Sequence, residues 1–121
     1  MVQAPDIAQL SQDCHSWREQ LRHERNEIGE LKHRLQEAAA KNPPRELLTD
    51  VEHYHNQFYI QLINIHDLKH AIKDYEHNLH GKTVTDELIG QHDRIHQEYQ
   101  NLEHIISDLR TDFHVFLSRT S

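Results

Sequence analysis

The stretch CHSWREQLRHERNEIGELKHRL, residues 14–35, carries the pattern that decides the fold. Its apolar residues recur at alternating intervals of three and four, which is the heptad spacing of a helix with one narrow buried face. The same spacing extends in both directions along the chain, and most of the residues between are charged residues or Gln. The full stripe consists of Ile7, Leu10, Cys14, Trp17, Leu21, Glu24, Ile28, Leu31, Leu35 and Ala38.

Two segments rich in helix breakers, KNPPRE (41–46) and LHGKTVTDE (79–87), divide the chain into three parts of similar length. Each of the other two parts has its own heptad-spaced stripe, so we expect helices at about residues 5–41, 43–80 and 84–118. The second stripe consists of Val51, Tyr54, Phe58, Gln61, Ile65, Leu68, Ile72, Tyr75 and Leu79; the third of Leu88, His92, Ile95, Tyr99, Leu102, Ile106, Leu109, Phe113 and Phe116.

Short connections between rods of equal length place consecutive helices side by side and antiparallel. Each rod would have about 35 residues and be roughly 50 Å long. The sequence therefore predicts an all-α fold: residues 1–121 form a single domain, an antiparallel up-down-up bundle of three long helices with coiled-coil-like heptad packing. Gly81 suits the left-handed position after the second helix, and Thr83 or Thr85 suits the cap of the third.

The composition limits the classes of partner. The formal charge is −7 with His neutral, and no run of Lys and Arg appears, so we expect neither nucleic acid nor a membrane surface as partner. No stretch approaches the roughly 20 apolar residues of a membrane span, and the beginning MVQAPDIAQL does not resemble a secretion signal. A single Cys fits a reducing compartment, so the expected location is cytoplasmic.

The second predicted helix carries more apolar residues than one bundle face can bury. Tyr59, Ile60 and Ile63 fall well away from its stripe. Burying side chains of this size is worth about 1.5–3 kcal/mol each. These residues favour an interface with a second copy, in a homo-dimer or other homo-oligomer, or with a different protein. A monomer with an exposed patch is the alternative.

Glu24 is the one charged member of the first stripe. A polar residue in a heptad core often fixes register or stoichiometry at a cost in stability. The equally simple alternative is that its carboxylate reaches the rim of the bundle and stays solvated.

The chain contains 13 histidines, which raises the question of metal binding. HDLKH (66–70) and HDRIH (92–96) each place two histidines one turn apart, so His66, His70, His92 and His96 are candidate ligands for a weakly held Zn²⁺, Ni²⁺ or Cu²⁺. Two Glu-x-x-His motifs, ELKH (30–33) and EHYH (52–55), resemble those of di-iron bundles, but such sites normally use four helices. A metal-binding bundle holding Zn or Fe is the alternative function, and solvated histidines are the simpler interpretation.

Cys14 and His92 both lie on stripes and map to the same layer of the bundle, which predicts a buried polar pair. A reactive thiol–imidazole dyad needs a third orienting group and a substrate pocket, so core packing is favoured. The chain shows no phosphate-binding Gly-rich loop and no nucleophile motif. The sequence thus favours a non-enzymatic interaction or scaffold protein. Because histidines concentrate in residues 43–80, we also expect its association or solubility to depend on pH between about 5.5 and 7.

Overall fold

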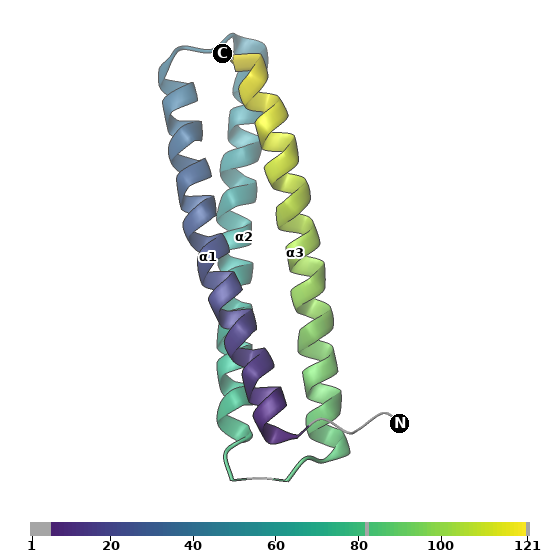
Figure 1. Ribbon diagram of the computed structural model, residues 1–121. Helices are drawn as coiled ribbons and strands as arrows, with labels where there is room; N and C mark the ends of the chain where they lie inside the picture. Colours follow the sequence, from purple (N-terminus) through teal and green to yellow (C-terminus); the bar gives the residue numbers. More distant parts are fainter. Residues whose placement is uncertain (1–5, 82, 121) are drawn as a thin grey trace.

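A computed structural model describes residues 6–81 and 83–120 of the chain. They form three long helices, α1 (Ile7–Ala40), α2 (Arg45–Asn78) and α3 (Asp86–Thr120), and the described residues contain no strand. α1 and α3 run in one direction and α2 runs in the other, with all three side by side (Figure 1). The predicted all-α, up-down-up bundle is confirmed.

Side chains and a glycine mark the ends of α1, α2 and α3. Asp6 caps α1 by accepting a 2.8 Å hydrogen bond from the Gln9 backbone N–H. Thr85 caps α3 in the same way through a 3.2 Å bond from the Leu88 N–H. Gly81 has φ +69°, the left-handed conformation that glycine adopts without steric cost.

α2 begins at Arg45, slightly later than the expected residue 43. The reason is the proline pair, because a residue that precedes proline is disfavoured in the helical conformation. Pro43 therefore stays outside the helix, and Pro44, with φ −53° and ψ 148°, is the last residue before it. Asn42 turns the chain with a positive φ of 53°. At the other boundaries, α3 continues to Thr120, and the expected start of α1 at residue 5 lies outside the described residues.

The three heptad stripes form the core. Nearly all their members are buried; the half-buried ones are Ile7, Val51, His92 and Tyr99. At the end where α2 begins, Tyr54 and Phe58 of α2 pack against Phe113 of α3, with ring centroids 5.0–5.3 Å apart.

Hydrogen bonds and ion pairs fix the register between the helices. The hydroxyl of Tyr54 donates to the carbonyl of Asp112, and that of Tyr75 donates to the carbonyl of Leu88. Ion pairs join every pair of helices, and each has half-exposed partners. They are Arg18–Glu76 between α1 and α2, Arg110–Glu27 between α3 and α1, and Arg119–Asp50 between α3 and α2.

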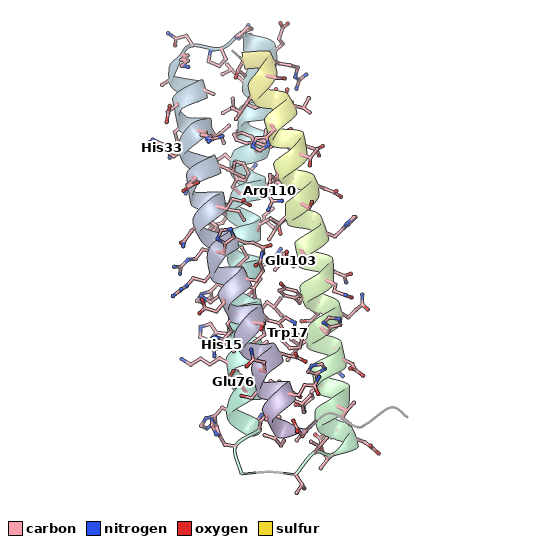
Figure 2. The ribbon with its side chains drawn as sticks, in the orientation of Figure 1. His15, Trp17, His33, Glu76, Glu103 and Arg110 are labelled. Carbon is pink, nitrogen blue, oxygen red and sulfur yellow. The ribbon has the colours of Figure 1, made fainter. Side chains whose placement is uncertain are left out.

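A polar layer interrupts this core near its middle. Glu24 is 2 % exposed and Gln61 is 4 % exposed, so the solvated alternative for Glu24 is wrong. The two tyrosine bonds set a register between α2 and α3 that brings Gln61 level with Glu103, which is half-buried and lies on α3 (Figure 2). Gln61 accepts a 3.2 Å hydrogen bond from Asn64.

Glu24 and Glu103 interact within this layer. Burial, followed by a hydrogen bond to Glu103 and the charge of Glu103, raises the pKa of Glu24 from 4.5 to about 8. One oxygen of each carboxyl, Oε2 of Glu24 and Oε1 of Glu103, is buried and meets no donor among the described residues. Two carboxylates offer only acceptors, whereas a protonated carboxyl donates to its neighbour. We therefore infer that Glu24 is protonated at neutral pH and shares its proton with Glu103.

We predict that Glu24→Gln stabilises the protein increasingly as pH rises. Well below pH 4.5, the Glu24 carboxyl is protonated in both folded and unfolded chains. Between about pH 4.5 and 8, the unfolded chain releases this proton while the folded chain keeps it, so the wild type loses stability. Gln cannot titrate, and its amide still donates to Glu103. Urea unfolding at several pH values in this range measures the difference in free energy.

The matched control is Glu30→Gln, because Glu30 is an exposed residue of the same helix. Its stability difference from the wild type should change little over this range. If Glu24→Gln stabilised the protein by the same free energy at every pH, the inference that Glu24 shares a proton with Glu103 would be wrong.

Candidate interaction surface

The side of α2 that points away from the core carries large apolar side chains. Tyr59 is 59 % exposed, and Ile60 and Ile63 are each 43 % exposed. They are exposed because the opposite side of α2, with Phe58 and Ile65, already fills the core. The structure therefore places all three residues that the sequence analysis assigned to an interface on one accessible surface.

These residues belong to a second regular pattern on α2. Starting from Glu52, exposed positions follow one another at alternating intervals of four and three residues. This is again the spacing of a straight stripe along a helix. We call it the outer stripe; its members are Glu52, Asn56, Tyr59, Ile63, His66 and His70. The spacing of apolar residues does not reveal this stripe, because only two of its positions are apolar.

A further exposed isoleucine lies on α3, beside α2. Ile105 of α3 is 45 % exposed and lines a groove of about 320 Å³ together with Asn64 and Leu68 of α2. Ile60 precedes Asn64 by one helical turn, on the same side of α2. Ile105 was not predicted as an interface residue, because it lies outside the α3 stripe and its position beside α2 depends on the tertiary register.

The two histidine pairs lie on different sides of the bundle. His66 and His70 have ring centroids 4.6 Å apart and line a groove between α1 and α2. His92 and His96 both pack against Trp17 of α1, with their own centroids 6.4 Å apart. The four candidate ligands therefore do not converge. Across residues 6–81 and 83–120, no group of three or more His, Cys, Asp or Glu side chains is arranged to hold a metal ion.

The Glu-x-x-His motifs are also on the surface. The His33 side chain is 72 % exposed, points away from the bundle (Figure 2) and pairs with Glu37 at 3.0 Å. Glu52 and His55 are exposed as well. These residues lack the inward orientation that di-iron carboxylate bundles require.

Cys14 and His92 occupy different environments. Cys14 is fully buried, and burial together with the nearby charge of Glu76 raises the pKa of its thiol to about 12. A thiol with this pKa stays protonated at neutral pH and is a poor nucleophile. His92 is half-buried, interacts with Asp13 through Nε2 at 2.8 Å and packs on Trp17 at 5.0 Å. The bonding partner of this imidazole is thus a carboxylate at the rim, which the sequence analysis had not considered.

No helix among the described residues is long and apolar enough to span a bilayer. Comparison of the chain with protein-family models, with curated proteins and with solved structures found no match. The outer α2 surface, with Tyr59, Ile60 and Ile63, exposes more large apolar side chains than α1 or α3 does among the described residues.

Proposed function

We propose that this chain is a non-enzymatic interaction protein that acts through self-association of the outer α2 face. The exposure of Tyr59, Ile60 and Ile63 on one side of a helix whose other side fills the core is the observation that carries the proposal. An isologous interface uses the same patch of both copies, so the patch must complement itself.

The outer stripe is self-complementary when two α2 helices pair in antiparallel fashion around residue 61. Positions at equal distances on either side of this centre then face each other. Tyr59 of one copy faces Ile63 of the second, Asn56 faces His66, and Glu52 faces His70. Apolar side chains thus meet at the centre, and an acid meets an imidazole at both ends. A parallel pairing would set each Glu52 beside the other and each His70 beside the other.

The apolar part of this contact is small, because it involves only a few half-exposed side chains on each copy. Small interfaces give weak and reversible association. We therefore expect dimers to appear at protein concentrations on the order of 100 µM rather than in dilute solution. A heterologous protein seated on the same face is the competing occupant, and it would leave the purified chain monomeric at all concentrations.

We predict that Ile63→Lys abolishes dimer formation. The substitution places a charge at the centre of the contact, opposite Tyr59 of the second copy. Because Ile63 is already exposed, the fold should be unaffected. Sedimentation velocity over a concentration series measures the average mass, and circular dichroism checks the helix content.

Val115→Lys is the matched control, because Val115 is an apolar residue that is 58 % exposed on α3. This variant should dimerise like the wild type. A wild-type chain that stays monomeric, or an Ile63→Lys chain that still dimerises, would contradict the proposed surface.

The antiparallel register leads to a second prediction, which uses two single-cysteine substitutions. When Tyr59→Cys and Ile63→Cys proteins are mixed and oxidised, the disulfide should join one chain of each kind, because these positions face each other. Mass spectrometry of the crosslinked species identifies its two chains. The native thiol of Cys14 does not compete, since it is buried and protonated. Crosslinking of each variant mainly with itself would indicate a parallel pairing.

We also predict that dimerisation strengthens as pH falls from about 7 to 5.5. Imidazoles gain a proton in this range. Protonated His70 would attract Glu52 of the second copy. The formal charge of −7 on each chain would also become less negative, so the two chains would repel each other less. Arg18, Arg25, Lys69 and Lys73 line the same groove as His70, and Lys73 lies one helical turn from it.

Glu52→Gln removes the acidic partner and should flatten the pH dependence measured by sedimentation. His104→Gln, at a side chain that is 79 % exposed on α3, removes one titrating group elsewhere and should leave it unchanged. Equal dimerisation at both ends of the pH range would refute the role of the Glu52–His70 contact.

A further inference from the structure

Basic side chains from α1 and α2 line one groove of this acidic protein. The groove has a volume of about 340 Å³, and all but one of its lining residues are basic. Arg18 and Arg25 come from α1, which lies next to the part of α2 that contributes the others. The lining residues are Arg18, Arg25, Ile65, His66, Lys69, His70 and Lys73.

Most of the charge in this groove is uncompensated. In the part of the chain that the structure describes, Arg25, Lys69 and Lys73 form no ion pair. Arg18 does bind Glu76, with both carboxylate oxygens 3.1 Å from its Nη2. However, the Nε of Arg18 is buried and has no hydrogen-bond partner among the described residues.

The nearby acid does not neutralise the groove. Glu19 attracts Lys69, but its carboxylate is already paired with Arg22 at 3.1 Å. Burial, followed by the positive charges of Arg25 and two further arginines of α1, lowers the pKa of Lys69. Folding thus gathers cations that repel one another, although the chain as a whole carries a formal charge of −7.

We propose that this groove binds a soluble anion that carries several linked phosphate groups. An anion would relieve the repulsion between the cations and supply an acceptor for the N–H of Arg18. The guanidinium groups suit bidentate contacts with phosphate oxygens, and the lysines act as point charges. His66 and His70 add positive charge when they are protonated.

The spread of the cations favours a chain of phosphates over a single one. Arg18 and Arg25 are separated by about 10 Å along α1, and Lys69 and Lys73 by about 6 Å along α2. A single phosphate is too short to contact all of these groups, whereas a linear polyphosphate extends along the groove. The volume of about 340 Å³ is at the lower end of the range for small-molecule sites, so a nucleic acid duplex does not fit inside it.

Binding of inorganic tripolyphosphate to the full chain tests the proposal. Isothermal titration calorimetry at constant ionic strength should show binding to the wild type, with orthophosphate binding about tenfold or more weakly. The combined change Lys69→Gln and Lys73→Gln should weaken tripolyphosphate binding by about tenfold or more, because it removes two charge-assisted contacts.

The control combines Lys32→Gln with Lys41→Gln. These lysines lie outside the groove, and their replacement changes the net charge by the same amount. Binding by this variant should stay within about twofold of the wild type. If both double variants lost affinity equally, or if orthophosphate bound as tightly as tripolyphosphate, the proposed site would be wrong.

A measurement on the wild-type protein tests the proposal even if a variant fails to fold. Tripolyphosphate should shift the imidazole NMR signals of His66 and His70, and leave in place that of His104, which lies on α3 outside the groove and is 79 % exposed. Uniform shifts, or none, would overturn the proposal. Because His66 and His70 also belong to the outer stripe, the spectra are recorded at protein concentrations well below those at which dimers are expected, so that signal shifts from dimerisation do not contribute.

Discussion

The narrowness of the core is the constraint on which the rest of this structure depends. Three helices in contact share a core only one stripe wide on each helix, and in this chain every such position is taken by a stripe residue. A side chain outside the stripes must therefore be exposed or lie at a groove between two helices. The exposed isoleucines of α2 and the basic groove beside it are both consequences of this geometry. Both proposals concern α2, since one side of it fills the core and the other is exposed.

The sequence was sufficient for the fold because heptad spacing is a local signal that three helices repeat without interruption. It assigned Leu21, Phe58 and Phe113 to the core from spacing alone, and each is fully buried. Whether the Glu24 side chain is buried or solvated did not follow from the sequence, because the answer depends on a residue far away in the chain. Only the register between α1 and α3 brings Glu103 close enough to share a proton with it.

The same limitation explains what was missed on the surface. Ile105 and Ile60 come from different helices, and neither lies on a stripe, so no local pattern connects them. The basic groove is a stronger example: Arg25 and Lys69 are distant in the chain, and no run of Lys and Arg appears in the sequence. The absence of such a run was the reason for expecting no cationic surface. Antiparallel packing of α1 and α2 nevertheless assembles one on a small scale. Conversely, the spacing of the histidines suggested that their side chains could converge on one metal ion, but the helix orientations keep the two pairs apart. The pairs are His66 with His70 and His92 with His96.

His66 and His70 connect the two proposals, because they belong to the outer stripe and also line the basic groove. An anion in the groove would favour their protonated forms, and protonated His70 is the form that attracts Glu52 of a second copy. Anion binding and dimerisation should therefore strengthen each other, since a coupling free energy acts equally in both directions. On these two proposals, an anion in the groove would adjust the charge on the outer face of α2 without any change in the packing of the core.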